Sequence, residues 1–411
     1  MARIKSLFFK NVLTLFKGNV LFQLTIILTL IFLARHYSVE QIGRYAVFIS
    51  IISIISTIAP GRLEMAIMLP KEDKKAFNIF ISSLLIIFLV SFIFLLVSFF
   101  FSMYNVFFTE ANGFVGLVVF FGIIFAALTL LQIQYLNRFE RFNIVSNGKI
   151  LVALIISFLQ ILSVFYFKSV FSLVLAYTIG FFAGSAYYYF KLKSNTKNHI
   201  IDFNAIKPTI AEYKKFPTLN SASSLFNIIA NQGPVIFIEV VYGSAISGFY
   251  SVVQRTLNAP TSLIGSAFSQ VFYKKITGDL FNNHRKFMIS CTKYLFIIGV
   301  LIFIAVQLLS NELYVIVFGE EYIESAKIAK VIVVFFIMRL IFVSQNAFLI
   351  AKGKLGKDLG FNIIYLFSML LPILFCSLFN IEWYICVIII TVTGTLTFLY
   401  LAYLLFKKSN I

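Results

Sequence analysis

The chain has 411 residues, of which 60% are hydrophobic and 12% are charged, and its formal net charge at pH 7 is +18. Soluble domains carry about 25% charged residues, so a mean hydropathy of +0.96 excludes a water-soluble globular fold. The long apolar runs are typical of membrane-spanning helices, because barrel strands alternate apolar and polar residues over about ten positions. The sequence therefore predicts an all-α polytopic membrane protein.

Twelve apolar stretches follow one another along the chain, each long enough for the roughly 20 residues that a helix needs to cross the hydrocarbon core. The first six lie near residues 12–34, 42–69, 76–101, 113–136, 144–167 and 169–190. The second six lie near residues 218–242, 247–272, 287–309, 326–351, 359–379 and 382–406. An even number of transmembrane helices places both termini on one side of the membrane.

Lysine and arginine residues are unevenly distributed between the junctions that join these spans. Of the 34 residues of these two types, 27 lie in the tails, in the even-numbered junctions or at the span ends beside them, and five lie in or beside the odd-numbered junctions. Short cytoplasmic loops collect Lys and Arg, so both termini are predicted to be cytoplasmic. The net charge then reflects topology and contact with anionic membrane lipid, and nucleic acid is not an expected partner.

A long polar stretch divides the predicted spans into two sets of six. We expect an N-terminal six-helix lobe at residues 1–190, a cytoplasmic linker at 191–215 and a C-terminal six-helix lobe at 216–411. A short motif recurs at the first outer junction of each half, as Gly-Arg-Tyr at 43–45 and Gly-Phe-Tyr at 248–250. Two halves of the same topology are typical of carriers built from a parallel repeat around a central cavity.

Five ionisable side chains of the predicted spans are candidates for a functional role, because a charge at the helix centre costs about 2.5 to 3.5 kcal/mol and requires a partner or a watery cavity. They are Arg62, Glu64, Glu239, Arg255 and Arg339. The sequence Pro60-Gly61 is expected to bend or unwind the second span. Arg62 and Glu64 would point to different sides of a regular helix, so we expect each to find its own partner, a cavity or, by snorkelling, the cytoplasmic surface.

The seventh span carries a polar face. Asn227 and Asn231 are four residues apart and share one helix stripe, and Gln232 and Glu239 lie on an adjacent stripe. Two interpretations stay open, because these amides either line a cavity or pack the bundle through hydrogen bonds between helices. Glu239, near the outer end, also fits an interfacial carboxylate. No Walker loop or metal-ligand spacing is present, so we expect no catalytic residues, no bound metal and no cofactor.

Five segments resemble the Wzx-type polysaccharide-repeat flippases of the multidrug/oligosaccharidyl-lipid/polysaccharide (MOP) exporter superfamily. They are LARHYSVEQIGRYA at 33–46, GRLEMAIMLPK at 61–71, KKFPTLNSASSLFN at 214–227, GFYSVVQRTLNAPTSLIGSAFSQVFYKK at 248–275 and FGEEYIESAKIAKV at 318–331. The resemblance implies two lobes around a cationic cavity in the bacterial inner membrane. It also implies the cargo, an undecaprenyl-diphosphate-linked oligosaccharide repeat unit such as O-antigen, which moves from the cytoplasmic to the periplasmic leaflet by alternating access.

Guanidinium groups bind phosphate oxygens in a bidentate manner, and amides bond sugar hydroxyls. The predicted substrate-binding residues are therefore Arg62, Arg255, Arg339, Asn227, Asn231 and Gln232. The resemblance further implies coupling to a gradient of H+ or Na+, with Glu64 and Glu239 as alternative coupling groups. The resemblance also implies other membrane proteins of polysaccharide assembly as partners.

Two other functions compete with this hypothesis. A multidrug exporter of the same superfamily would carry acidic and aromatic cavity residues for organic cations, whereas three of the five candidate residues named above with charged side chains are arginines. A membrane-bound polysaccharide polymerase or ligase would need a long outer loop with His and Arg, and the predicted outer junctions are short.

Overall fold

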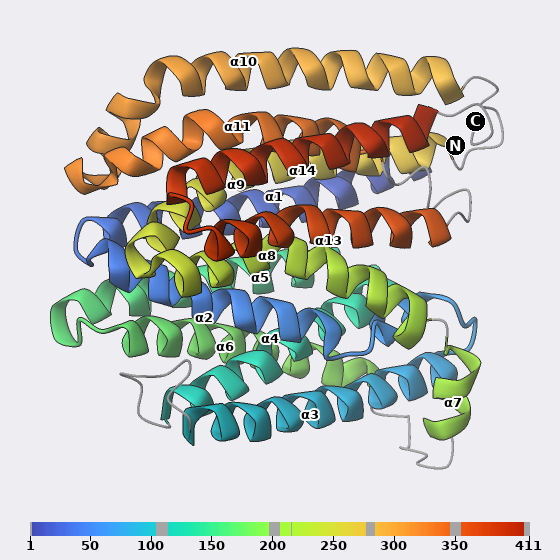
Figure 1. The fold of residues 1–411 in the computed structure, drawn as a ribbon. Coiled ribbons are helices and arrows are strands. Elements are labelled where there is room, and N and C mark those ends of the chain that lie inside the picture. Colours follow the sequence, from blue (N-terminus) through green and yellow to red (C-terminus); the bar gives the residue numbers. More distant parts are fainter. Residues whose placement is uncertain are drawn as a thin grey trace. The chain divides into compact units, whose positions relative to one another are not determined.

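The computed structural model describes residues 2–103, 114–196, 206–214, 216–276, 284–345 and 355–406, and these residues form helices and short connections without a strand (Figure 1). The long helices are α1 (Ala2–Ala34), α2 (Val39–Ile58), α3 (Asp73–Met103), α4 (Phe114–Arg138), α5 (Phe142–Tyr166), α6 (Val170–Thr196), α8 (Ser221–Tyr242), α9 (Ser244–Ile276), α10 (His284–Phe318), α11 (Ile323–Val343), α13 (Leu355–Leu378) and α14 (Trp383–Phe406). Short elements are η1 (Leu63–Met68), α7 (Ile206–Glu212), η3 (Phe216–Asn220) and η4 (Glu320–Tyr322). The all-α fold class is confirmed.

Ten helical stretches of the described chain are long and apolar enough to cross a membrane. The helices α9 and α11 do not meet this description, although both have comparable length. Lys327, Lys330 and Arg339 lie in α11, and α9 is rich in Ser, Thr and Asn. The structure thus supports ten spans by length and composition, and the full count of twelve stays a prediction.

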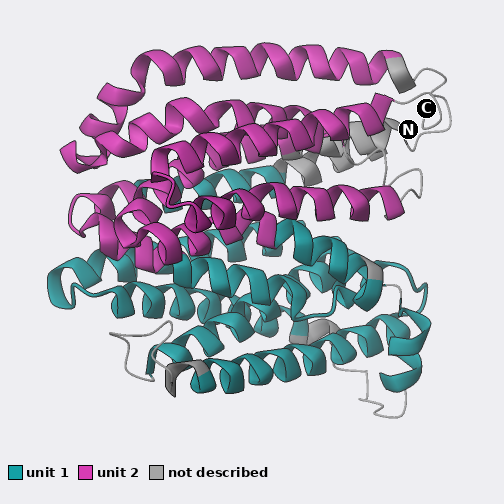
Figure 2. Cartoon of the chain, viewed as in Figure 1, with its two compact units in different colours: residues 1–29, 47–228 teal, residues 30–46, 229–411 magenta. Residues whose placement is uncertain are grey.

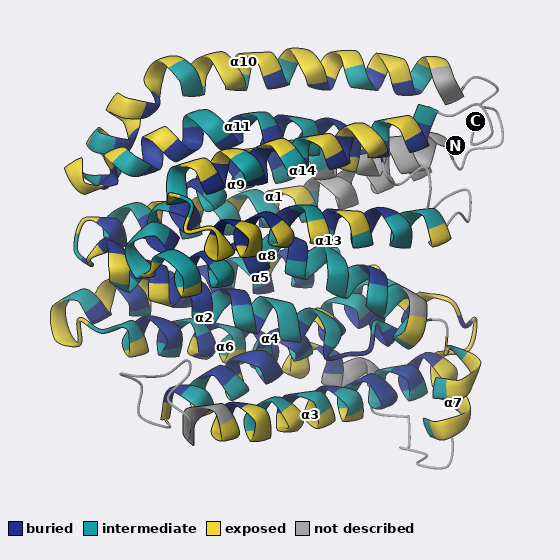
Figure 3. Ribbon diagram, viewed as in Figure 1, coloured by how far each residue is buried: buried dark blue, intermediate teal, exposed yellow. Residues whose placement is uncertain are grey.

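Apolar side chains cover the outside of several helices, as expected for a protein surrounded by lipid. On α10, for example, Leu301 is 63% exposed and Leu308 is 70% exposed, and many residues of α10 are drawn as exposed in Figure 3. Soluble proteins rarely expose contiguous apolar surface of this extent. These surfaces agree with the membrane location that the composition predicts.

The chain divides into two compact units, coloured separately in Figure 2. Unit 1 comprises Met1–Thr29 and Val47–Ile228, and unit 2 comprises Leu30–Ala46 and Ile229–Ile411. The junction between α1 and α2 therefore belongs to unit 2. The predicted lobe and linker boundaries at 190 and 215 stay a prediction.

The same helix pairings occur in each unit. In unit 1, α3 packs against α4, and α6 packs against both α4 and α5. In unit 2, α10 packs against α11, and α14 packs against both α11 and α13. These are the third and fourth, fourth and sixth, and fifth and sixth spans of each predicted half, which is the recurrence that a repeated six-helix unit would produce.

Each of the two units has a core that contains aromatic rings. In unit 1 a buried cluster surrounds Tyr135 and Tyr188, and the hydroxyl of Tyr188 donates to the carbonyl of Val145 over 2.9 Å. In unit 2 the rings of Tyr365 and Phe398 lie 5.4 Å apart at the centre of an aromatic cluster. Aromatic rings at this separation contribute about 0.5 to 1.5 kcal/mol beyond their burial, so each core holds its helices in a defined packing.

Candidate functional site

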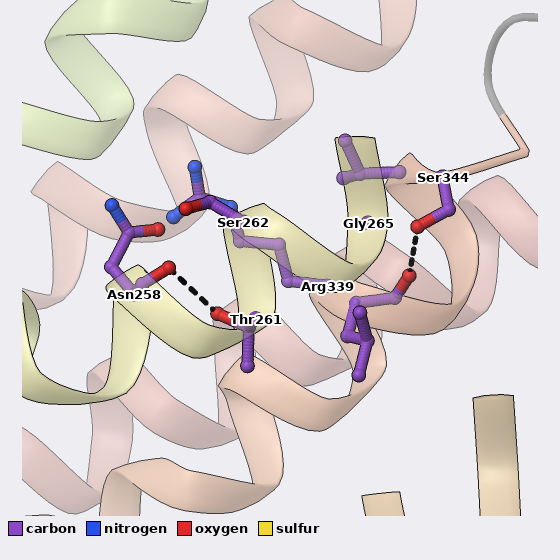
Figure 4. Close-up of a pocket in the computed structure, with 8 residues that line it drawn as sticks. Asn258, Thr261, Ser262, Gly265, Arg339 and Ser344 are labelled. Carbon is purple, nitrogen blue, oxygen red and sulfur yellow. Dashed lines mark hydrogen bonds between the residues drawn. The ribbon is translucent and has the colours of Figure 1, made fainter. Parts of the chain in front are cut away.

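A pocket of about 260 Å³ lies between α9 and α11 of unit 2 (Figure 4). Its lining residues are Asn258, Thr261, Ser262, Gly265, Arg339, Leu340, Val343 and Ser344. The two helices approach closely at Gly265, where a Cβ would lie 3.0 Å from Ser344 Oγ. A pocket with a charged group and several polar groups is unusual inside an apolar helix bundle and marks a candidate binding site.

The hydroxyl groups of the pocket bond to their own helix. Thr261 Oγ1 donates to the carbonyl of Leu257 over 2.7 Å, and Ser262 Oγ donates to the carbonyl of Ala259 over 3.0 Å. Such bonds to the preceding turn satisfy the donors of Ser and Thr within a helix. Each hydroxyl oxygen then keeps acceptor capacity for a ligand that offers donors.

Arg339 supplies the positive charge of this pocket. Its side chain runs from α11 toward the side chains of Asn258 and Ser262 (Figure 4). None of the ion pairs found among the described residues involves Arg339. A guanidinium without a carboxylate partner in such a pocket is suited to bind an anion, and its planar fork matches phosphate geometry.

Asn231 forms hydrogen bonds with two neighbouring helices of unit 2. The hydroxyl of Tyr365 on α13 donates to Asn231 Oδ1 over 3.0 Å. The backbone carbonyl of Asn231 also accepts from Gln254 Nε2 over 2.5 Å. These contacts join α8 to α9 and α13, so Asn231 has the packing role that was one of its two predicted roles.

The two other predicted amides lie elsewhere. Asn227 belongs to unit 1 and Gln232 to unit 2, both are partly exposed, and neither lines the pocket. Both side chains already make contacts within the protein. Their predicted contact with the cargo stays a prediction.

Arg255 stacks on an aromatic ring rather than facing the pocket. Its guanidinium carbon lies 5.2 Å from the centre of the Tyr45 ring. A cation over an aromatic face is stabilised by about 0.5 to 2 kcal/mol, depending on how far it is desolvated. Arg255 and Arg339 therefore occupy separate environments in unit 2, while Arg62 belongs to unit 1.

The prediction that Arg62 and Glu64 would find separate partners is wrong. Arg62 Nη1 and Glu64 Oε1 form an ion pair at 3.4 Å. The prediction assumed a regular helix, whereas Gly61 and Arg62 have left-handed backbones, with φ of 64° and 52°, and Leu63–Met68 forms the 3-10 helix η1. This change of backbone direction brings the two side chains together.

The Arg62–Glu64 pair is incompletely satisfied. Glu64 is 4% exposed, and Arg62 Nε and Glu64 Oε2 are buried without a hydrogen-bond partner in the described structure. Buried polar atoms without partners cost about 1 to 3 kcal/mol each. Strained backbone and unsatisfied charge in one segment are typical of functional sites.

Arg138, counted in the sequence only as a cytoplasmic charge, holds this segment in place. Its Nη1 donates to the carbonyls of Ile67 and Pro70 over 2.8 and 2.7 Å, and its Nη2 lies 2.9 Å from Asp73 Oδ1. One guanidinium thus fixes the end of η1 and the start of α3. Arg138 lies 65 to 71 residues from these partners in the sequence, so the sequence alone does not reveal the contact.

Glu239 forms part of a polar chain at the junction of α8 and α9. Ser244 Oγ donates to Glu239 Oε1 over 2.5 Å, and Arg44 Nε donates to Ser244 Oγ over 3.3 Å. The second oxygen, Oε2, is buried without a partner among the described residues. Glu239 does not line the Arg339 pocket.

Lys149 is a further cation inside a candidate span, and sequence reasoning missed it. It lies in α5, where the candidate span covers Phe142–Tyr166, and its Nζ donates to Asn19 Oδ1 of α1 over 2.8 Å. None of the ion pairs in the described part of the chain involves it. The charge count assigned this lysine to the cytoplasmic junction, although it lies inside the predicted span at 144–167 and more than one turn inside α5.

Comparisons with known proteins identify the family of the chain and proteins that share its fold. Residues 8–273 match the family described as polysaccharide biosynthesis protein. Similar solved structures include the lipid II flippase MurJ in an inward closed conformation, with a TM-score of 0.73 and 14% identity over 96% of this chain and 87% of that one. The MATE multidrug transporter DinF-BH has a TM-score of 0.70 and 15% identity over 97% and 94% of the two chains. No curated protein matches the sequence.

Proposed function

Because the chain belongs to the polysaccharide biosynthesis protein family, we propose that it is a flippase for an undecaprenyl-diphosphate-linked oligosaccharide repeat unit. The repeat unit is that of O-antigen or a similar surface polysaccharide, and it moves from the cytoplasmic to the periplasmic leaflet of the bacterial inner membrane. The fold shared with a lipid II flippase supports this proposal. Both termini are cytoplasmic in the orientation that the distribution of Lys and Arg predicts.

The observation that carries the proposal is the Arg339 guanidinium in the pocket between α9 and α11, which forms no ion pair with another described residue. A diphosphate with a sugar head group cannot cross hydrocarbon unaided, because its charges and hydroxyls would lose their hydration. Arg339 offers donors to phosphate oxygens, and Asn258 with the hydroxyls of Thr261 and Ser262 offers partners to sugar hydroxyls. The apolar tail remains in the lipid around the helices.

In addition to the Arg339 pocket of unit 2, we assign cargo contacts to two cations of unit 1, Arg62 and Lys149. Coupling to an H+ or Na+ gradient belongs to the same proposal. Glu64 and Glu239 each have one buried carboxylate oxygen without a hydrogen-bond partner in the described structure, and a proton or a Na+ ion would satisfy that oxygen. The transport cycle is alternating access, as in carriers with two repeated halves.

Deletion of the chain tests the proposed function. We expect surface polysaccharide to disappear while its lipid-linked repeat unit accumulates, because assembly continues on the cytoplasmic side without transfer to the other leaflet. Extraction of the lipid-linked saccharides and immunoblotting of surface polysaccharide measure both effects. Normal surface polysaccharide together with increased drug sensitivity would instead support a multidrug exporter, the function named for DinF-BH.

Lys149 gives a prediction specific to unit 1. Lys149→Gln should reduce transport about 10- to 100-fold, because a hydrogen bond to a charged group contributes about 1.5 to 3 kcal/mol. Lys149→Arg should retain most activity, since it keeps the positive charge. Lys75→Gln is the matched control, because the Lys75 side chain is 53% exposed. Equal transport by Lys149→Gln and the control, at equal amounts of membrane protein, would show that Lys149 only packs against Asn19.

A further inference from the structure

The motif that recurs in the two halves of the sequence forms a direct backbone contact within unit 2. A Cβ on Gly43 would overlap the carbonyl oxygen of Ser244 and would lie 2.8 Å from the backbone nitrogen of Gly248. A Cβ on Gly248 would overlap the carbonyl oxygen of Val39. The start of α2 and the start of α9 therefore touch each other at positions that only glycine can occupy without a shift of the backbone.

The contact is reciprocal. Val39 precedes Gly43 by four residues, and Ser244 precedes Gly248 by four residues. Each glycine thus packs on the carbonyl one helical turn before the other glycine, as expected when equivalent helices of a repeat cross. Close crossing at small residues is a common way for helices to associate in membranes.

Polar contacts surround this crossing. Arg44 Nε donates to Ser244 Oγ over 3.3 Å, and the same hydroxyl donates to Glu239 Oε1 over 2.5 Å. Further into the helices, the Arg255 guanidinium lies over the ring of Tyr45 at 5.2 Å. These contacts hold residues 30–46 to the remainder of unit 2. The polar groups that form them can be solvated by water when the two segments separate. The attachment is therefore suited to be reversible.

We propose that the Gly43–Gly248 crossing is the outer gate of the transport path and that residues 30–46 leave α9 when the outer side opens. In the orientation predicted from Lys and Arg, the crossing lies at the periplasmic ends of α1, α2, α8 and α9. The inference rests on the proposed function, since a gate requires a transported cargo. Its physical basis is the glycine pair, which lets two backbones meet without interlocked side chains that would resist separation.

Alanine at either glycine tests the gate. Gly43→Ala and Gly248→Ala place a methyl group against a carbonyl oxygen of the other helix, so the closed state is destabilised and the open state gains population. The reporter is Ser251→Cys, because Ser251 is 1% exposed and lies on α9 one turn after Gly248. We expect labelling by a membrane-impermeant maleimide from the periplasmic side to become about tenfold faster, which corresponds to about 1.4 kcal/mol. Protein without the reporter measures the background from the buried native residues Cys291, Cys376 and Cys386.

Gly360→Ala is the matched control, since a Cβ at that position on α13 meets nothing within 4 Å. Ser244→Ala is a second variant that removes the bridging hydroxyl without a steric clash, and it should accelerate labelling to a smaller extent. If the glycine variants do not fold, Ser244→Ala decides the result. Labelling at the parental rate in the folded variants would overturn the gate. The assay uses no cargo, so its result is independent of the deletion phenotype that tests the proposed function.

Discussion

Arg339→Gln should reduce transport about 10- to 100-fold without lowering the amount of protein in the membrane. The guanidinium makes no ion pair with a described carboxylate, so its replacement breaks no ion pair among the described residues. It removes instead a charge-assisted contact to the cargo, worth about 1.5 to 3 kcal/mol. Arg339→Lys should retain intermediate activity, because lysine supplies the charge without the planar fork.

The measurement is surface polysaccharide in a deletion strain complemented with each variant, with membrane levels determined in parallel. Lys327→Gln is the matched control, since it removes a positive charge from the same helix at an exposed position that pairs with Glu324 over 2.7 Å. Full transport by Arg339→Gln at normal membrane levels would contradict a role for the pocket in holding phosphate.

Asn258→Asp refines this prediction with almost no change in side-chain shape. Figure 4 shows the Arg339 side chain directed toward Asn258, so a carboxylate at position 258 would compete with phosphate for the guanidinium. We expect transport to fall about as far as in Arg339→Gln. An uncharged change at the same position, Asn258→Ser, should have a smaller effect, because it removes an amide and leaves Arg339 free for the cargo.

The helices were predictable because the apolar runs are long and the polar junctions are short. The interruption at Pro60-Gly61 is also confirmed, since α2 ends at Ile58 and the backbone turns at Gly61 and Arg62. The prediction of a span over 42–69 extended too far, because apolar composition cannot distinguish a helix from the buried 3-10 segment that follows it. Hydropathy likewise predicted α9 and α11 to be membrane spans, although neither is among the ten candidate spans of the described chain.

The candidate site was only partly predictable. The cost of a charge in hydrocarbon singled out Arg339, but Asn258, Thr261 and Ser262 carry no such signal, since Ser, Thr and Asn often pack helices together. Their role depends on the contact between α9 and α11, which a single sequence does not reveal. The membership in the MOP superfamily is confirmed by the family match and the shared fold. The Wzx-type assignment remains part of the proposed function.

The Arg62–Glu64 pair should produce the largest effect on stability. Removing one partner of a buried ion pair costs about 3 to 5 kcal/mol, because the remaining charge is left without compensation. Glu64 is 4% exposed and its Oε2 already lacks a partner among the described residues, so Arg62→Gln should destabilise the protein strongly. Its melting temperature in detergent and its membrane level should both fall well below those of the unmodified protein.

The double variant Arg62→Gln with Glu64→Gln separates the two roles of this pair. Two neutral amides leave no uncompensated charge, so most of the lost stability should return, as expected for residues that interact directly. Transport should not return, because Arg62 is also a proposed cargo contact in unit 1. Recovery of both stability and transport would show that the pair serves only the fold. Failure of the double variant to regain stability would show that Arg62 stabilises η1 through contacts other than Glu64.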